Sequence, residues 1–161
     1  MISRFRRFGP VFPAGLLGGL LGGLLVLGAW AAALSSAGPA LAAELTVEVL
    51  GLSSDKGKVH FGLYDNPATF PDKEARIQGV ETAIRNGRAE AMFRGLEKGL
   101  YAVAVFHDEN GNGSFDQALF GIPLEDFGFS NGAKAFFGPP SFESAQVPVP
   151  AGGAKITIRV D

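Results

Sequence analysis

Residues 99–106 have the sequence Gly-Leu-Tyr-Ala-Val-Ala-Val-Phe, and this stretch decides the fold. Successive residues of a strand point to opposite faces of a sheet, so a strand with one solvated face alternates between apolar and polar residues. Here both alternating sets are apolar. The stretch therefore predicts a central strand that is covered on both of its faces.

Two shorter segments before it show the other kind of pattern. Residues 45–49 (Leu-Thr-Val-Glu-Val) and residues 58–64 (Lys-Val-His-Phe-Gly-Leu-Tyr) alternate between apolar and polar positions. The polar residues 53–57 (Ser-Ser-Asp-Lys-Gly) separate them. Two alternating runs joined by a short polar segment are typical of a β-hairpin.

Further strand signals lie elsewhere in the chain. Residues 89–93 alternate after Asn86-Gly87, a pair typical of hairpin turns, and residues 155–160 alternate as a partly exposed strand that closes a sheet. Residues 66–79 contain prolines and mixed charges and are expected to form a long loop or a short irregular helix. Six or seven short strands without a clear helix among them predict an all-β fold, a two-sheet sandwich with Greek-key connections.

The N-terminal segment has the order of a secretory signal peptide. Its first seven residues carry three arginines and no acid, and residues 11–34 carry no charge. The small residues of Ala40-Leu41-Ala42 then occupy the positions that a signal peptidase inspects. We expect cleavage after Ala42, with Ala43 as the second choice, so that residues 1–42 are removed. The alternative is a retained membrane anchor, because an apolar run of about 20 residues can span a bilayer.

Cleavage would leave residues 43–161 as a single β-sandwich domain, exported to a periplasm or out of the cell. These residues carry eleven Lys and Arg against sixteen Asp and Glu, which is a net charge of −5. This acidity argues against nucleic acid or a membrane surface as the partner and leaves an envelope or extracellular ligand. The chain has no cysteine, so the domain depends on packing, helped by any ion that it binds.

A loop rich in Asp and Asn follows the central strand, with the sequence His-Asp-Glu-Asn-Gly-Asn-Gly-Ser-Phe-Asp at residues 107–116. Counted from Asp108, side chains with oxygen fall at positions 1, 3, 5 and 9, and a glycine falls at position 6. Calcium takes about six to eight oxygen ligands, and a chain that curls around the ion presents alternate residues to it. The predicted calcium ligands are the side chains of Asp108, Asn110, Asn112 and Asp116 and the carbonyl oxygen of Ser114.

The loop departs from a complete EF-hand calcium loop. Position 12, where an EF-hand has a bidentate glutamate, is Leu119, so Glu125 or Asp126 would have to complete the shell. Only two of the predicted ligands carry formal charge, and we expect binding in the range of about 10⁻⁴ to 10⁻³ M that extracellular modules have. The alternative is a turn without an ion, because Asp, Asn and Gly are also the residues of tight turns.

Several short sequences together resemble one known family. They are Phe93-Arg94-Gly95-Leu96, Gly99-Leu100-Tyr101, residues 105–113, Phe120-Gly121-Ile122-Pro123, Phe127-Gly128-Phe129-Ser130-Asn131 and Phe137-Gly138-Pro139-Pro140-Ser141-Phe142. In this order they are similar to a bacterial family of exported proteins catalogued as domain of unknown function 2141, over about residues 44–160. The resemblance implies a small exported sandwich of immunoglobulin-like or transthyretin-like type with about seven strands, and it implies no activity.

Residues 119–142 are rich in phenylalanine and glycine, and two interpretations of this stretch are open. The rings fill the edge of the sandwich, which is the usual place of aromatic side chains. Alternatively, they stand exposed as a surface for a carbohydrate or protein partner that binds without an ion.

The sequence contains no motif of an enzyme active site. It has no cysteine nucleophile, no Gly-x-Ser-x-Gly turn and no pair of histidines at a zinc-binding spacing. A hydrolase with a carboxylate or metal-bound water site would need His107, Asp116 and the phenylalanine-rich wall to converge in one pocket. Neighbouring residues of a strand face opposite sides, so His107 and Asp108 are not expected to act together. We therefore expect a binding or structural module of the cell envelope without catalytic residues.

Overall fold

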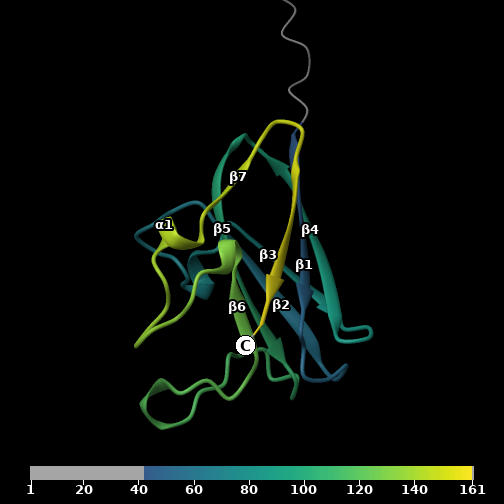
Figure 1. The fold of residues 1–161 in the computed structure, drawn as a ribbon, viewed down its shortest axis with the longest axis vertical. Coiled ribbons are helices and arrows are strands. Elements are labelled where there is room, and N and C mark those ends of the chain that lie inside the picture. Colours follow the sequence, from purple (N-terminus) through teal and green to yellow (C-terminus); the bar gives the residue numbers. More distant parts are fainter. Residues whose placement is uncertain (1–41, 161) are drawn as a thin grey trace, which may run out of the picture. The chain divides into compact units, whose positions relative to one another are not determined.

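The computed structural model describes residues 42–160, which form eight strands (Figure 1). The strands are β1 (Ala43–Leu50), β2 (Lys58–Tyr64), β3 (Gln78–Ala83), β4 (Arg88–Leu96), β5 (Gly99–Asp108), β6 (Phe127–Phe129), β7 (Val147–Val149) and β8 (Ala154–Arg159). Short helices lie in the connections: the 3₁₀ helices η1 (Lys73–Ala75), η2 (Leu119–Gly121) and η3 (Ser130–Gly132), and α1 (Phe142–Ala145). Residues 1–41, which hold nearly all of the predicted signal peptide, lie outside the described residues.

The strands form two sheets, which confirms the predicted all-β sandwich. The smaller sheet has the order β4-β1-β8, and the larger sheet has the order β3-β2-β5-β6, with β7 also paired to β5. β1 pairs antiparallel with β4 and parallel with β8. β5 lies between β2 on one edge and β6 and β7 on the other, so it is a central strand as predicted. The predicted cover on both faces is incomplete, because Ala104 and Phe106 are only half-buried on the outer face. β6 and β7, with three residues each, are too short for alternation to predict them.

The predicted hairpin of residues 45–49 and 58–64 is wrong. β1 and β2 both form, but they belong to different sheets, and their buried side chains meet in one core cluster. Alternation predicts that a strand has one buried face, but it does not select the strand that pairs with it. The turn at Asn86-Gly87 is confirmed, with φ angles of 54° and 67°, and it leads from β3 of the larger sheet to β4 of the smaller one.

The core between the sheets is built from alternate residues of the long strands. Its fully buried members include Leu45, Phe61, Phe93 and Ile158. A second cluster lies on the outer face of the larger sheet, where α1 covers it, and it consists of Tyr64, Ala102, Phe142 and Ala145. No α-helix of the described residues covers the rest of this outer face, and loops border it. No helix within residues 42–160 combines the length and the hydropathy that crossing a membrane requires.

The edge of β5 that carries both β6 and β7 has a gap between them. β6 pairs with residues 104–106 and β7 pairs with residues 99–101. Between these positions, the hydroxyl of buried Ser130 accepts a hydrogen bond from the backbone N–H of Val103 at 2.8 Å and donates one to the carbonyl oxygen of Ala145. In the gap between β6 and β7, this hydroxyl group therefore bonds the backbone of β5 in place of a strand, and it links α1 to the sheet.

Candidate functional site

A row without large side chains crosses the outer face of the larger sheet. Gly79 of β3, Gly62 of β2 and Ala104 of β5 are cross-strand neighbours, so nothing larger than a methyl group rises from these three positions. Phe129 of β6 ends the row. Glycine inside a strand often marks a place where another group approaches the backbone closely. Gly62 and Ala104 lie on the floor of a hollow in the surface. The Arg76 side chain covers Gly79, and the Tyr64 ring lies close to Gly62.

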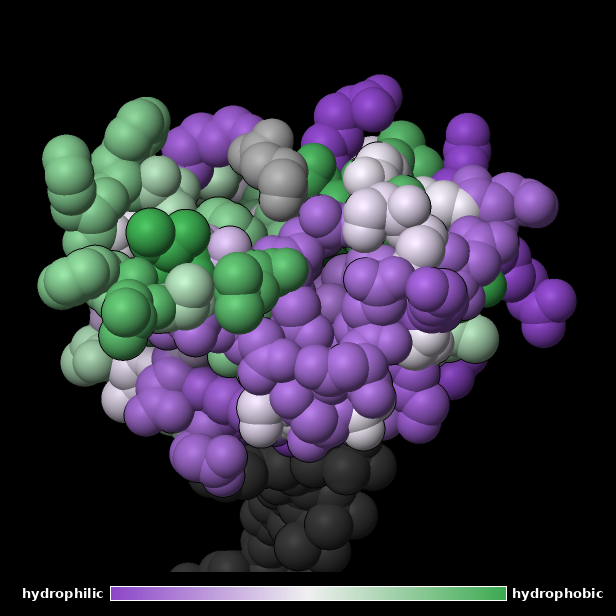
Figure 2. Space-filling view, turned by 90° about the horizontal axis from the view of Figure 1, so that it is seen from below, coloured by the Kyte–Doolittle hydropathy of each residue, from purple (hydrophilic) through white to green (hydrophobic). Residues whose placement is uncertain are grey.

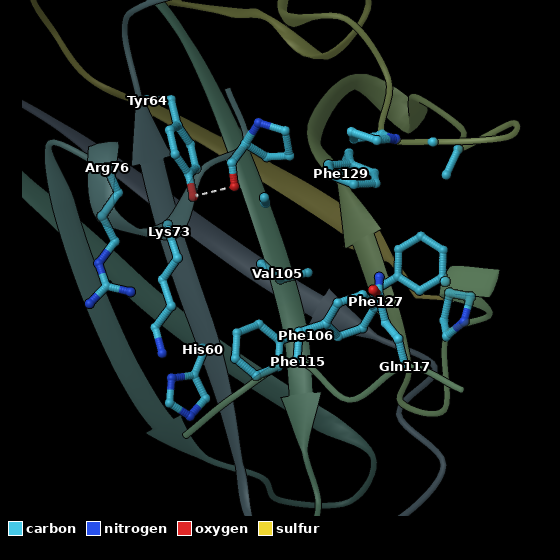
Figure 3. A pocket seen from close by; sticks show the side chains of 18 of the residues that line it. His60, Tyr64, Lys73, Arg76, Val105, Phe106, Phe115, Gln117, Phe127 and Phe129 are labelled. Carbon is cyan, nitrogen blue, oxygen red and sulfur yellow. Dashed lines mark hydrogen bonds between the residues drawn. The ribbon is translucent and has the colours of Figure 1, made fainter. Parts of the chain in front are cut away.

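This hollow is a cavity of about 740 Å³ with aromatic walls (Figure 3). The volume lies within the range of ~300–1,000 Å³ that is typical of small-molecule sites. Phe106, Phe115, Phe127 and Phe129 line the cavity, and successive rings in this order are 5.7–5.9 Å apart between centroids. Aromatic pairs at such spacings attract one another. The four rings thus form one continuous apolar wall.

The loops at the rim of the cavity expose apolar side chains. Phe120 and Phe137 line the cavity and are fully exposed, and both have positive φ angles, 66° and 53°, which are uncommon for residues other than glycine. Figure 2 shows hydrophobic side chains gathered on one part of this surface, in green on the left, beside a mostly hydrophilic area. The other exposed large apolar residues of these loops are Leu119, Ile122, Leu124 and Phe136.

The two interpretations of residues 119–142 therefore each hold for part of the stretch. Phe142, the first residue of α1, is buried against the sheet. Phe127 and Phe129 are half-buried in the cavity wall. Phe120 and Phe137 are exposed instead. The exposed rings come from loop positions, where no alternation exists that would predict which side chains are covered.

Polar groups occupy the side of the cavity toward β2 and β3 (Figure 3). Lys73 and Arg76 come from the segment around η1. Arg76 lies over Gly79, where an added Cβ atom would be 2.5 Å from its Nε. The Tyr64 hydroxyl donates a hydrogen bond to the carbonyl oxygen of Pro71 at 3.1 Å, and burial raises the pKa of Tyr64 to about 12. The tyrosine is therefore neutral at physiological pH, and the two basic residues carry the charge on this side.

His60 lies at the end of the cavity near the loop rich in Asp and Asn. Its ring stacks on Phe106, with 4.6 Å between the ring centroids and 7° between the planes. Nε2 lies 3.1 Å from Oδ2 of Asp108, and Nδ1 lies 3.5 Å from Oε1 of Glu81. Three neighbours therefore fix the orientation of the imidazole, and each ring nitrogen faces a carboxylate.

Asp108 organises the loop that follows β5. Its Oδ1 accepts hydrogen bonds from the backbone N–H groups of Gly111 and Asn112 at 2.7 and 3.0 Å. Its Oδ2 accepts one from the N–H of Gly113 at 2.8 Å and lies 3.1 Å from Nε2 of His60. Burial alone would raise the pKa of Asp108, but the hydrogen bonds from Gly113, His60, Gly111 and Asn112 hold it below its ordinary value. A carboxylate has about four acceptor positions, and these contacts use them, so Asp108 is the anchor of the loop.

Two of the other predicted calcium ligands, Asn110 and Asn112, contact the predicted ligand Asp116. Nδ2 of Asn110 lies 2.6 Å from Oδ2 of Asp116, and Nδ2 of Asn112 lies 3.0 and 3.1 Å from its two oxygens. The amide oxygens accept backbone N–H groups instead, from Asn112 itself and from Ser114. The predicted curl is therefore present, closed by its own hydrogen bonds. Calcium needs oxygen ligands, so both amide groups would have to turn over to bind it.

Glu125 rather than Asp126 reaches this loop. Oε2 of Glu125 accepts a hydrogen bond from the N–H of Asp116 at 3.0 Å, and Oε1 is buried without a hydrogen-bond partner. Asp126 is engaged elsewhere, since it accepts one from the N–H of Ser53 at 2.8 Å. Within residues 42–160, no group of three or more His, Cys, Asp or Glu side chains has the arrangement of a metal site. Any ion in this loop would therefore depend on amide and carbonyl oxygens as well as carboxylates.

His107 does not face the cavity. It lies on the inner face of β5 with 1% of its surface exposed, and its Nδ1 is 3.4 Å from Oδ2 of Asp126. Asp108 points to the outer face, as alternation along the strand predicts. The convergence of His107 and Asp116 on the phenylalanine-rich wall is therefore not formed, and the histidine that lines the cavity is His60.

A comparison with protein families agrees with the resemblance in the sequence. The model of a family described as an uncharacterized protein conserved in bacteria, DUF2141, matches residues 47–157. The chain belongs to this family. No curated protein and no solved structure matches it. The part that matches DUF2141 runs from β1 into β8 and includes every residue that lines the cavity.

In this DUF2141 domain, the sequence did not predict that Lys73 and Arg76 line the cavity. Residues 66–79 have no periodic pattern, so they predict a loop and nothing about which cavity it borders. One signal was available: Gly62 interrupts an alternating strand, and a glycine there indicates a close approach or an open space above the sheet.

Proposed function

We propose that the domain is an exported binding module that holds an apolar ligand in the aromatic cavity on the outer face of the larger sheet. One observation carries the proposal: Gly62 and Ala104, neighbours with no large side chain, lie on a cavity floor beside a continuous aromatic wall. A larger apolar side chain at Ala104 would bury more surface in this cavity, and each buried methylene contributes about 0.8 kcal/mol. The free domain forgoes that contribution and leaves space for another molecule.

The exposed rim supports the same proposal. Phe120 and Phe137 stand in water beside the cavity, where a bound molecule would cover part of their surface. Soluble proteins seldom expose contiguous apolar patches without a binding role. Export, which we propose from the N-terminal sequence, would bring this surface into contact with the molecules of the cell envelope.

The neutral apolar dye N-phenyl-1-naphthylamine tests this proposal, because its fluorescence rises in apolar surroundings. We expect the purified protein to increase the emission of the dye in a saturable way. Ala104→Phe places a ring on the cavity floor, and we expect it to weaken binding by about tenfold or more. The control is Thr46→Phe, which adds the same ring to the smaller sheet between Met92 and Lys155.

Circular dichroism and urea unfolding of both variants establish that they are folded. Equal binding by the Ala104→Phe variant and the unchanged protein would contradict the proposal, as would an equal loss in both variants. A loss in Ala104→Phe alone supports it.

We also propose that residues 108–116 form a weak calcium site with ligands from Asn110, Asn112, Asp116 and Glu125. The buried and unpartnered Oε1 of Glu125 favours this second function, because an unsatisfied buried polar atom costs stability that a cation would recover. Asp108 would hold the loop, and the carbonyl oxygen of Ser114 would add a ligand. Phe115 lies in the same loop, so the ion would also fix one ring of the cavity wall.

Calorimetric titration with calcium tests this site. We expect a dissociation constant of about 10⁻⁴ to 10⁻³ M, and a gain in unfolding free energy of about 1.4 kcal/mol when free calcium is about ten times that constant. Glu125→Gln should weaken binding, whereas Glu109→Gln should not, because Glu109 points outward to Ser54 at 2.8 Å. If millimolar calcium produced neither heat of binding nor a gain in unfolding free energy, the proposed calcium site would be wrong.

A further inference from the structure

We propose that the ligand of the aromatic cavity is an amphiphile with one anionic head group, and that Lys73 and Arg76 bind this head group. The inference rests on the proposed function of the cavity and adds the chemical class of its ligand. A carboxylate, sulfate or phosphate on an apolar chain has the required chemistry.

The charged side chains that line the cavity are all basic, although the domain is acidic. Residues 43–161 carry a net charge of −5. Yet the described lining residues include the cations of Lys73 and Arg76 and no Asp or Glu. A local field opposite in sign to that of the whole domain attracts an anion to this position.

Neither cation is neutralised by a carboxylate in the described part of the chain. Nζ of Lys73 donates a hydrogen bond to the carbonyl oxygen of Gly113, which leaves further N–H donors on the ammonium group. Arg76 lies along the backbone of Gly79 and forms no ion pair within residues 42–160. Both groups can therefore donate charge-assisted hydrogen bonds to an added anion.

The acids near these cations have other partners. Oδ1 of Asp72 accepts a hydrogen bond from the N–H of Glu74 at 3.0 Å and caps η1. Glu81 lies 3.5 Å from Nδ1 of His60 and 3.3 Å from Nζ of Lys58. Both carboxylates are thus already engaged, although Asp72 is close enough to the cavity to help raise the pKa of Tyr64.

The cavity is also divided in the way that an amphiphile requires. Figure 3 shows Lys73 and Arg76 on the side of β2, whereas Phe115, Phe127 and Phe129 lie across β5 from them. A molecule that spans the floor would place its head at the cations and its chain against the rings. The chain would then leave through the rim.

Displacement of bound N-phenyl-1-naphthylamine tests the inference with three ligands of equal chain length: dodecanoate, dodecanol and dodecylamine, all below their micellar concentrations. We expect dodecanoate to bind about five- to tenfold more tightly than dodecanol, since two partly exposed cations each contribute about threefold. Dodecylamine should bind most weakly. Added salt should reduce the advantage of dodecanoate and leave dodecanol unchanged.

Lys73→Gln and Arg76→Gln should each reduce the affinity for dodecanoate by about threefold and leave that for dodecanol unchanged. Arg94→Gln is the matched control, because Arg94 lies on β4 of the other sheet and pairs with Glu44 at 3.1 Å. Equal affinity for all three ligands would overturn the inference and leave the proposed function standing. Failure of every ligand to displace the dye, or failure of the dye to bind, would overturn the proposed function itself.

Vesicles separate the two sources of such a ligand. Phosphatidylcholine vesicles with and without phosphatidylglycerol are added in the same displacement assay. Displacement only by vesicles with the anionic lipid supports a head group taken from a membrane, and displacement by dodecanoate alone supports a dispersed amphiphile. Displacement by both vesicle types to the same extent would overturn the requirement for an anion.

Discussion

Replacing Ser130 by alanine removes one oxygen atom from the gap between β6 and β7. The N–H of Val103 and the carbonyl oxygen of Ala145 then lose their partner, and both residues are completely buried. A buried backbone group left without a partner costs about 1–3 kcal/mol. Two such groups, with some local rearrangement, give an expected loss of about 3 kcal/mol of unfolding free energy. This is a large share of the ~5–15 kcal/mol that stabilises a typical domain.

Urea unfolding followed by circular dichroism measures this loss. With a urea dependence of about 2 kcal/mol per molar, the midpoint for Ser130→Ala should fall by roughly 1.5 M. Ser144→Ala is the control, because Ser144 is exposed and its substitution should change stability by less than about 0.5 kcal/mol. A midpoint for Ser130→Ala within about 0.3 M of the unchanged protein would refute the reasoning, since it would mean that water satisfies both backbone groups.

Three further predictions concern two carboxylates, one glycine and one aromatic contact. The lowered pKa values of Asp108 and Asp126 stabilise the fold above the ordinary carboxyl value of 3.8, and this stability should be lost as the pH falls from there through the folded pKa values, as acid unfolding would show. Gly57→Ala should destabilise far more than Gly111→Ala in urea unfolding, because both have positive φ but only the Cβ at Gly57 would meet the Asp108 carbonyl oxygen, at 1.9 Å; equal effects would argue against this clash. Phe70→Ala should increase proteolysis of residues 65–77, since Phe70 packs on Tyr64 with 5.2 Å between ring centroids; unchanged cleavage would contradict this role.

β1, β4 and β8 could be predicted from the sequence because burial alternates along them. Residues 99–106 have two apolar faces, and β5 does lie inside its sheet. Pairing could not be predicted in the same way, as the separation of β1 and β2 shows. Val49 of β1 and Val59 of β2 need only a common core, and two facing sheets provide it as well as a hairpin does.

The cavity depends on contacts between distant positions, which a single sequence does not reveal. Gly62 and Ala104 share a floor only because β2 pairs with β5 in this register. The conformation of the loop at residues 108–116 was easier to predict from the sequence, because the residues that form it are close together in the chain. The spacing predicted that Asn110 and Asp116 face the inside of one loop. It predicted neither the hydrogen bond between them nor that the four acceptor positions of Asp108 serve the loop and His60.

Because β1 pairs in parallel with β8, the smaller sheet can be completed only late in folding. Ala154, the partner of Leu45, lies 109 residues after it, so the smaller sheet is incomplete until almost the whole chain has been made. Contacts this distant in sequence close slowly, because a large loop must lose its freedom first. A chain threaded through a translocation channel has to stay extended until it emerges. If the domain is exported as we propose, the pairing of β1 with β8 would delay closure of the sandwich until threading is over.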